Sequence, residues 1–378
     1  MEFDAAIVGS STAGLYAASL LSEEGKRIAV FEREKQIDPE RRIYIITPGI
    51  NRVWDSYPDS LILNKIQNIE ISGNQTKKLI SLNAPDLIME RKMITNILFE
   101  RAKAAGVQFF PNMEFKKFGP DKNNSYLVFL DENDREQIIK ASIVIGADGV
   151  KSQVRSQAGI SDPPIVPLLQ VEVMLPPDWK HDTTHVWFDR SRTKYFFWLI
   201  PESNNRAVVG LIDENDGEIK KSLNSFLEKF SFELIDIQRG AVTLHHPSFE
   251  PWANVGDCRV MLIGDAAGQV KVTTVGGTVT GLWGARAAVE AIINGRSYEE
   301  TYQPLKNELD LHWWIRGMLN QLDQVGYEKL IQLVSPKVHK FLAENDRDGM
   351  KNNFWKLAFI QPRYIPLGIN TIISSVIK

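Results

Sequence analysis

The sequence predicts an α/β protein in which one nucleotide-binding domain is interrupted by insertions. Residues 5–34 combine a strand, a glycine turn, a helix and a second strand, which is the compact βαβ arrangement. Two further strand-to-turn segments follow far away in the chain, at 141–155 and 258–292. Between them, at 165–215, strand-like runs alternate with polar turns, and this pattern is typical of an antiparallel sheet.

Length and composition fit a globular protein with more than one core. The chain has 378 residues, of which 43% are hydrophobic and 24% charged, enough for two or three domains. The net charge of −3 gives no reason to expect nucleic acid as a partner. The single cysteine, Cys258, excludes a disulfide within the chain and a multi-cysteine metal site. No HExxH motif occurs, so we expect no metal. No leader-like start or long apolar run is evident, so we expect a cytoplasmic location.

The first element is a glycine loop between strand and helix. Gly9 and Gly14 occupy the outer positions of a G-x-G-x-x-G loop, and Ser11 occupies the middle one. Glycine allows the tight turn and the close packing of the helix, and serine is small enough for backbone to approach a diphosphate. Glu32 ends the second strand, where a carboxylate can accept hydrogen bonds from a ribose. We predict a dinucleotide site at Gly9, Ser11, Thr12, Ala13, Gly14, Glu32 and Arg33; the alternative is that both glycines serve only turning and packing.

The second and third elements identify the dinucleotide. The stretch "ASIVIGADGVKSQVR" contains Asp148-Gly149, and "GDAAGQVKVTTVGGTVTGLWGAR" begins with Gly264-Asp265 and opens a helix at Gly276-Gly277. With the glycine loop, these motifs resemble the flavoprotein group of geranylgeranyl reductases, aromatic hydroxylases and flavin-dependent halogenases. The third segment, and the C-terminal region at 299–368, resemble the geranylgeranyl reductase family most closely.

The resemblance implies a Rossmann-like domain that binds FAD. It implies that Asp265 holds a ribityl hydroxyl, and that Gly276, Gly277 and Thr278 present backbone to the isoalloxazine ring. It further places Arg91 near the phosphates and the chain at Met113 near the adenine. Asp148 and Arg42 complete the expected cofactor site. Helix-start or surface charges are the alternative for Arg42 and Arg91.

The strand-rich region is expected to bind the substrate. In "KYFFWLIP", Tyr195, Phe197 and Leu199 alternate with Phe196, Trp198 and Ile200, so both faces of this strand are apolar and should be buried. One face can pack on the domain's own core, and the other needs an apolar ligand or a helix. The segment resembles the YxWxFP stretch of the reductases and the WxWxIP stretch of the halogenases. We expect a pocket of Tyr44, Tyr195, Phe197, Trp198 and Pro201, with Tyr195 as the proton donor.

These elements give a domain plan. Residues 1–160 and 250–298 would form the FAD-binding domain, with 40–88 partly on the substrate side. Residues 161–249 would form the substrate-binding sheet and 299–378 a C-terminal helical region. The last stretch, 365–378, has one apolar face, which suits either docking on the protein's own body or peripheral contact with a membrane.

The resemblance implies an FAD-dependent oxidoreductase that reduces carbon–carbon double bonds of a prenyl lipid by hydride transfer. The electron donor would be NAD(P)H or a carrier protein. Two alternatives stay open: a monooxygenase or halogenase that acts on an aromatic substrate, and a flavin electron-relay protein. One departure from the family concerns the cysteine that archaeal reductases often carry after the second strand, because "PERRIYIITPG" has none.

Overall fold

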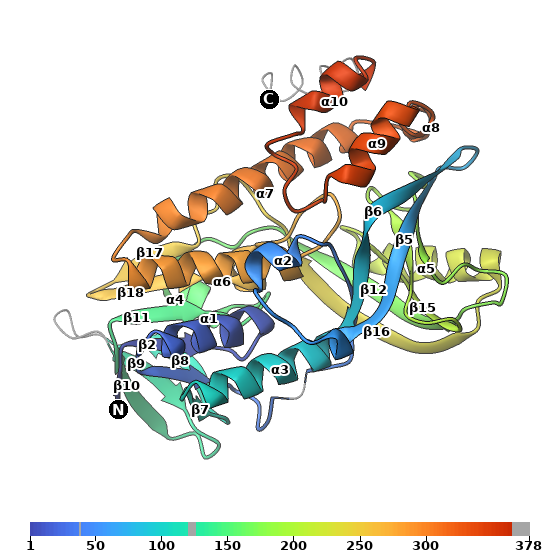
Figure 1. The fold of residues 1–378 in the computed structure, drawn as a ribbon. Helices are drawn as coiled ribbons and strands as arrows, with labels where there is room; N and C mark the ends of the chain where they lie inside the picture. The colour runs from blue at the N-terminus through green and yellow to red at the C-terminus, as the bar shows by residue number, and fades with distance from the viewer. Residues whose placement is uncertain (38, 120–125, 365–378) are drawn as a thin grey trace. The chain divides into compact units, whose positions relative to one another are not determined.

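The computed structural model describes residues 1–37, 39–119 and 126–364, and the chain divides into two compact units (Figure 1). Unit 1 comprises Met1–Arg42, Glu90–Ile165 and Thr243–Asp310. Unit 2 comprises Ile43–Met89, Val166–Val242 and Leu311–Lys378. Each unit is therefore assembled from three separate segments.

Unit 1 is built on a six-stranded sheet. The strand order is β17 (Trp252–Val255), β18 (Cys258–Leu262), β11 (Ile143–Gly146), β2 (Ala5–Val8), β3 (Ile28–Phe31) and β7 (Gln108–Phe110). All neighbours are parallel except the pair of β17 and β18. Helices α1 (Thr12–Glu23), α3 (Arg91–Ala104) and α6 (Thr278–Ile293) lie along this sheet (Figure 1). Cover on both faces explains why β2, β3 and β11 are uninterrupted apolar runs.

A four-stranded sheet lies against the other side of the parallel one and shares its core. It consists of β1 (Glu2–Phe3), β10 (Glu136–Ala141), β9 (Tyr126–Leu130) and β8 (Glu114–Phe118). Stacked rings fill the space between the two sheets, with Phe31 4.2 Å from Phe129 and 5.0 Å from Phe110, centroid to centroid. Alternate residues of β2 and β3 face this core, so the remaining ones face the helices.

Unit 2 is built on an eight-stranded sheet. Its order is β16 (Leu234–Thr243), β12 (Ile165–Met174), β15 (Arg206–Ile212), β14 (Phe197–Pro201), β13 (Thr183–Trp187), β5 (Ile62–Ser72), β6 (Lys77–Glu90) and β4 (Ile43–Ile46). The antiparallel pairing predicted for 165–215 is confirmed. The strands are not paired simply in chain order, as in a meander, because β12 pairs with β15 and β13 pairs with the distant β5 in parallel.

One face of this sheet is covered by α5 (Asp216–Phe230). Ile219, Leu223 and Phe226 of the helix pack on the strands, and the Phe226 ring stacks on Phe197 at a centroid distance of 4.5 Å. The serine after α5, Ser231, adopts a left-handed conformation and ends the helix. The domain's own core thus covers one of the two apolar faces that the sequence predicts for β14.

The remaining helices follow in the last segment. They are α7 (Tyr298–Asn320), α8 (Gln324–Gln332), α9 (Pro336–Glu344) and α10 (Trp355–Ile360); the division between the units falls within α7. Short helices α2 (Ile50–Val53), η1 (Asp59–Leu61), α4 (Gln153–Gln157) and η2 (Gly264–Ala267) complete the fold. The amphipathic stretch 365–378 lies outside the described residues.

Ion pairs connect the last segment to earlier parts of unit 2. Buried Asp86 on β6 accepts a hydrogen bond from Arg347 at 2.6 Å, and Arg52 pairs with Asp346 at 2.6 Å. The Asp86 carboxylate raises the pKa of Arg347, although burial opposes this. Within the described part of the chain, every helix is too short or too polar to cross a bilayer.

Candidate functional site

The glycine loop at the end of β2 has room for glycine only. Gly9 has φ +95°, and a Cβ there would lie 2.6 Å from the carbonyl oxygen of Ala147. A Cβ at Gly14 would lie 2.7 Å from the Gly9 carbonyl oxygen and 2.8 Å from the Ala147 methyl. All three distances are shorter than any ordinary carbon contact. The loop therefore packs tightly on the turn after β11, and both glycines are required by geometry.

Ser11 has a structural task that a glycine could not perform. It is the N-cap of α1, and its hydroxyl oxygen accepts a hydrogen bond from the Gly14 N–H at 3.2 Å. Thr12 is the first residue of the helix. Ala13 is buried, and its methyl group lies 3.4 Å from where a Cβ of Gly264 would be. Small residues thus allow α1 to approach the turn after β18, and the backbone N–H groups at the start of α1 are available to an anion.

Glu32 turns back toward the glycine loop. Its Oε2 accepts hydrogen bonds from the Ser10 N–H at 2.9 Å and from the Ser10 hydroxyl at 2.5 Å. Its backbone carbonyl accepts a hydrogen bond from the Met113 N–H at 2.8 Å. The chain at Met113 therefore lies beside Glu32, but the Met113 side chain is buried in the core of unit 1. Arg33 is exposed and pairs with Glu34 at 3.2 Å.

The Asp148 carboxylate caps the start of a helix. Its carboxylate accepts hydrogen bonds from the Ser152 hydroxyl at 2.6 Å and from the backbone N–H groups of Gln153 at 2.7 Å and Val154 at 3.1 Å. These bonds fix the start of α4. Burial raises the pKa of Asp148, and the hydrogen bonds oppose that rise. The Asp148-Gly149 pair shapes the turn that faces the glycine loop, and its side chain is occupied within that turn.

Arg155 is a residue whose role the sequence did not show. Its buried guanidinium donates to the carbonyl of Ala266 at 3.0 Å, to the carbonyl of Val150 at 2.8 Å and to Asp162 at 2.7 Å. It thereby joins the turn after β11 to the turn after β18. An arginine shortly after Asp148-Gly149 was visible in the sequence, but its partner Ala266 lies more than a hundred positions away.

Gln269 organises the third turn in the same way. Its side-chain oxygen accepts a hydrogen bond from the Gly264 N–H at 2.7 Å, and its amide donates to the Tyr298 hydroxyl at 3.1 Å. Tyr298 in turn donates to the Leu262 carbonyl at 2.9 Å. Gly264 and Gly268, at the two ends of this turn, have φ values of +63° and +58°. A buried amide thus holds a turn that glycine makes possible.

The charges of Arg42 and Arg91 act on the Asp265 carboxyl group. Asp265 is accessible to solvent, yet desolvation by the surrounding protein raises the pKa of its carboxyl group. The positive charges of Arg91 and Arg42 lower that pKa. The Arg91 N–H donates to the Arg42 carbonyl at 2.9 Å, which holds the two arginines together. An accessible carboxylate with protein and two cations close by is suited to bind a polar ligand.

The start of α6 lies next to Asp265. A Cβ at Gly277 would lie 2.9 Å from Val270 and 3.7 Å from the Asp265 carboxylate. Gly277 is the N-cap, without a side-chain cap, and Thr278 is the first residue of the helix. Lys271 is buried beneath Gly276: a Cβ at Gly276 would lie 3.6 Å from the Lys271 ammonium. Sequence reasoning missed this lysine, whose charge adds to that of the helix N-terminus.

In unit 2, the two faces of β14 have different surroundings, and the residues expected to line one pocket are divided between them. Phe197 lies under α5, so it belongs to the core and not to a pocket. Trp198 is on the opposite face, against Gly210, and its indole N–H donates to Gln170 at 3.2 Å. The Gln170 side-chain amide in turn donates a hydrogen bond to the Gln238 side-chain oxygen at 3.1 Å. The carbonyl of Pro201 accepts a hydrogen bond from Asn64 at 3.1 Å, and Tyr44 is a half-buried residue of β4.

Tyr195 is buried next to a guanidinium. The Arg316 guanidinium carbon lies 5.1 Å from the Tyr195 ring centroid and 5.8 Å from that of Phe196. Such distances allow a cation–π interaction with both rings. Burial raises the pKa of Tyr195 to about 12. The phenol therefore stays protonated at all physiological pH values.

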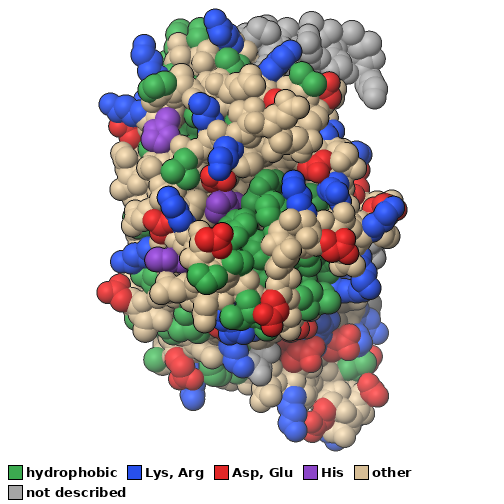
Figure 2. All heavy atoms as spheres, turned by 90° about the vertical axis from the view of Figure 1, so that its right-hand side faces the viewer, with side chains coloured by type: hydrophobic (Ala, Val, Ile, Leu, Met, Phe, Trp, Pro, Cys, Tyr) green, Lys and Arg blue, Asp and Glu red, His purple; other side chains and the backbone are tan. Residues whose placement is uncertain are grey.

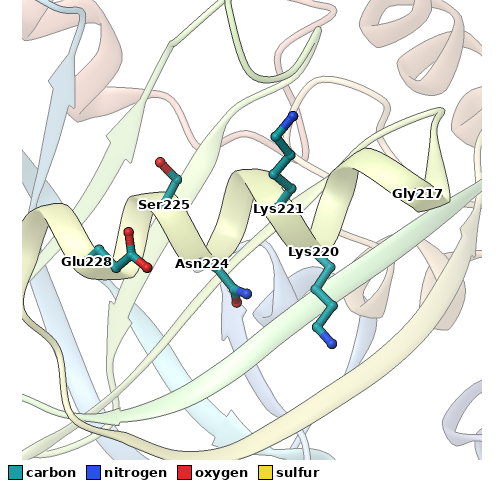
Figure 3. A pocket seen from close by; sticks show the side chains of 6 residues that line it. All are labelled: Gly217, Lys220, Lys221, Asn224, Ser225 and Glu228. Carbon is teal, nitrogen blue, oxygen red and sulfur yellow. The ribbon is translucent and has the colours of Figure 1, made fainter.

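A surface depression lies elsewhere in the part of the chain that the structure describes. A depression along α5 is lined by residues of that one helix, namely Gly217, Lys220, Lys221, Asn224, Ser225 and Glu228. Figure 3 shows Lys220 and Lys221 pointing in different directions, so these side chains do not converge on a ligand. Figure 2 shows acidic and basic side chains interspersed among those described on the face in view. Among the residues that the structure describes, no group of His, Cys, Asp or Glu is arranged to hold a metal ion.

Comparison with known families agrees with this geometry. The family model of the FAD binding domain matches residues 74–294. The model of the NAD(P)-binding Rossmann-like domain matches residues 7–37, the glycine loop. The first match extends over more than half of the chain.

Relatives and solved structures are similar along most of the chain. Digeranylgeranylglycerophospholipid reductase 2 of Methanopyrus kandleri is 28% identical over 80% of this chain and 79% of its own. Geranylgeranyl diphosphate reductase of Rhodobacter capsulatus is 27% identical over 77% of this chain and 75% of its own.

Among solved structures, a geranylgeranyl bacteriochlorophyll reductase-like protein of Thermoplasma acidophilum has a TM-score of 0.82 at 21% identity, over 98% of this chain and 99% of its own. The p-nitrophenol 4-monooxygenase of Pseudomonas putida has a TM-score of 0.73 at 15% identity, over 90% and 96% of the two chains. Both show a shared fold. The chain belongs to the FAD binding domain family, and it is an FAD-dependent oxidoreductase of the geranylgeranyl reductase-like kind.

Proposed function

We propose that the protein reduces carbon–carbon double bonds in the isoprenoid chain of a prenyl lipid. The observation that carries this proposal is the likeness to proteins named digeranylgeranylglycerophospholipid reductase over about four-fifths of both chains. Bound FAD, once reduced by an electron donor, would supply the hydride for such a reduction. The tasks of the protein are to hold the cofactor, to align an apolar chain and to exclude water.

The residues of unit 1 fit FAD. The loop from Gly9 to Gly14 and the start of α1 would hold the diphosphate, because a side chain fits at neither glycine and backbone N–H groups favour an anion. Glu32 would accept the ribose hydroxyls in place of its bonds from Ser10. The backbone at Met113, which is bonded to Glu32, would border the adenine.

A second group of residues would hold the flavin end. Asp265 would accept a ribityl hydroxyl, and the charges of Arg42 and Arg91 would face the phosphates. Gly276, Gly277 and Thr278 would present backbone N–H groups to the isoalloxazine ring. Lys271 would add positive charge beneath them, and positive charge there stabilises reduced flavin.

The substrate side of the proposal rests on unit 2. The face of β14 with Trp198 is not covered by α5. Trp198 is only 8% exposed, and its ring would border an apolar chain bound against this face. Tyr44, Tyr195 and Pro201 would complete the pocket, without Phe197. Because burial raises the pKa of Tyr195 to about 12, this phenol keeps its proton until a strong base forms on the substrate. It would then donate that proton to the second carbon of the reduced bond.

Two partners belong to the same proposal. The electron donor would be NAD(P)H or a carrier protein; the NAD(P)-binding match coincides with the segment assigned to FAD, so it does not mark a second nucleotide site. Membrane contact through 365–378 would give access to the lipid.

A monooxygenase is the second candidate, and the similarity in fold to p-nitrophenol 4-monooxygenase favours it. Its substrate would be aromatic and its oxidant molecular oxygen. The buried aromatic residues of unit 2 suit an aromatic ring as well as a prenyl chain.

One anaerobic experiment separates the two candidates. The purified yellow protein is reduced with dithionite, and a geranylgeranyl lipid is added in detergent without oxygen. The reductase predicts flavin reoxidation with stoichiometric formation of the saturated product, measured by absorbance and mass spectrometry. Reoxidation that requires oxygen and an aromatic compound would replace the proposal with the monooxygenase. Tyr195→Phe should slow turnover without changing lipid binding, whereas Tyr57→Phe, at a partly exposed tyrosine outside the proposed pocket, should change neither.

A further inference from the structure

Helix α10 presents two large aromatic side chains to solvent. Trp355 is 58% exposed and Phe359 is 77% exposed, the highest value among the described large hydrophobic residues. They are one helical turn apart, and their rings meet edge to face at a centroid distance of 5.6 Å. The helix has no buried residue at all. Helix α10 is therefore not held in place by side chains buried in the protein core.

All charged residues of the same segment are basic. Lys351, Lys356 and Arg363 are exposed, and no acidic residue occurs between Gly349 and Tyr364. The Lys356 ammonium lies 6.0 Å from the Trp355 ring centroid, so a cation borders the aromatic pair. We call Lys351, Trp355, Lys356, Phe359 and Arg363 the α10 surface.

Hydrogen bonds fix α10 to its own unit. The Gln361 amide donates to the Leu333 carbonyl at the end of α8 at 3.0 Å. The Asn353 amide donates to Asn345, at the end of α9, at 2.8 Å. Figure 1 shows α10 after α9 near the end of the described chain. The aromatic pair is thus presented from a held helix, and a ligand that covers it would be bound by the folded protein.

We propose that the α10 surface docks on the interface of an anionic lipid bilayer. Exposed Trp and Phe side chains bordered by Lys and Arg are the composition of an interfacial membrane anchor, because the rings enter the headgroup region while the cations contact lipid phosphates. The charge is complementary to an anionic membrane and opposes a second copy of this chain, since a symmetric contact would bring Lys356 against its own counterpart. The α10 surface is a different part of the chain from 365–378, through which the proposed function expects membrane contact.

The test uses full-length FAD-loaded protein and vesicles of phosphatidylglycerol or phosphatidylcholine. We expect sedimentation with phosphatidylglycerol vesicles that weakens with added salt. The double variant Trp355→Ser/Phe359→Ser should lose about tenfold or more in apparent affinity, since two exposed rings contribute to docking. Lys351→Gln/Lys356→Gln should weaken binding and reduce its dependence on salt. Ile138→Ser, at a 52% exposed residue of β10 in unit 1, is the matched control and should bind normally.

Two measurements keep this proposal separate from the proposed function. FAD content and turnover of a detergent-solubilised prenyl substrate should be the same in the double variant and the native protein. Equal vesicle binding by native and double-variant protein would overturn the docking proposal, as would the absence of any binding. Self-association that the aromatic substitutions abolish would identify a second copy as the occupant and would also overturn it.

Discussion

Replacing Gly14 by alanine tests the geometry of the cofactor loop. The new Cβ would lie 2.7 Å from the Gly9 carbonyl oxygen and 2.8 Å from the Ala147 methyl, whereas ordinary contact begins at 3.4 Å. The start of α1 must therefore move by about 0.7 Å, the difference between 3.4 and 2.7 Å. Such overpacking costs about 1–3 kcal/mol, and the better helix propensity of alanine offsets about 1 kcal/mol of it. The net loss in the free energy of unfolding is about 0–2 kcal/mol.

The effect on FAD should exceed the effect on stability. The displaced atoms belong to the loop and helix start proposed to hold the diphosphate, and a loss of about 1.4 kcal/mol there is a tenfold loss in affinity. We therefore expect at least a tenfold higher Kd for FAD, measured by titration of apoprotein and followed by flavin fluorescence. Thermal unfolding of the apoprotein measures the loss of stability separately.

Gly317→Ala is the matched control for this substitution. Gly317 is also a helical glycine, but a Cβ there would meet nothing within 4 Å. Alanine should stabilise α7 by up to about 1 kcal/mol and leave FAD affinity unchanged. Equal FAD affinity and equal stability in the two variants would refute the close approach at Gly14 and, with it, the proposed diphosphate site.

Three further predictions concern buried groups. Arg155→Met should lower the free energy of unfolding by about 1–3 kcal/mol for each backbone carbonyl left without a donor, and it should weaken FAD binding. The control Arg27→Met, at an exposed arginine, should do neither. Unchanged unfolding of Arg155→Met in urea would count against the link between the turns. The pKa of Tyr195 rises from 10.0 to about 12 on folding, so the neutral phenol is favoured in the folded state. The free energy of unfolding should therefore fall between pH 10 and about 12. Tyr195→Phe should unfold at higher pH than the native protein, and an unchanged midpoint of alkaline unfolding would contradict this. Burial raises the pKa of Cys258 to about 12, so thiol reagents should modify it only after unfolding, and rapid labelling of native protein would show that the thiol is accessible.

Local pattern was enough to predict the elements that surround the site. The β2–α1–β3 unit, the turns at Gly149 and Gly264 and the helix that starts at Thr278 all occur where the sequence places them. Each depends on a short stretch of apolar periodicity and on glycines whose positive φ or lack of a Cβ is a local necessity. The cofactor class was implied by the resemblance of the three motifs to a known flavoprotein group.

The sequence could not predict which contacts individual side chains make, and the physical reason is the same in each case. Asp148 carries a carboxylate at the expected position, but its nearest donors are Ser152 and the start of α4, so it caps a helix. Phe197 and Trp198 both appeared suitable for a pocket, and only the position of α5 shows which of the two is core. The period of two in a strand predicts two faces and does not say which one is covered.

The sequence by itself determined the fold class and the alternation of faces, because these follow from interactions within about thirty residues or from motifs with a fixed geometry. The flavin followed from the resemblance of its motifs to a known family. The tertiary structure alone decided that Arg155 binds the turn at Ala266, that Gln269 holds Gly264 through Tyr298, and that Arg42 and Arg91 act on Asp265. These partners are separated by long stretches of chain. A hydrogen bond or a charge interaction depends on distance in space, and only the packing of the two sheets and the helices of unit 1 fixes that distance.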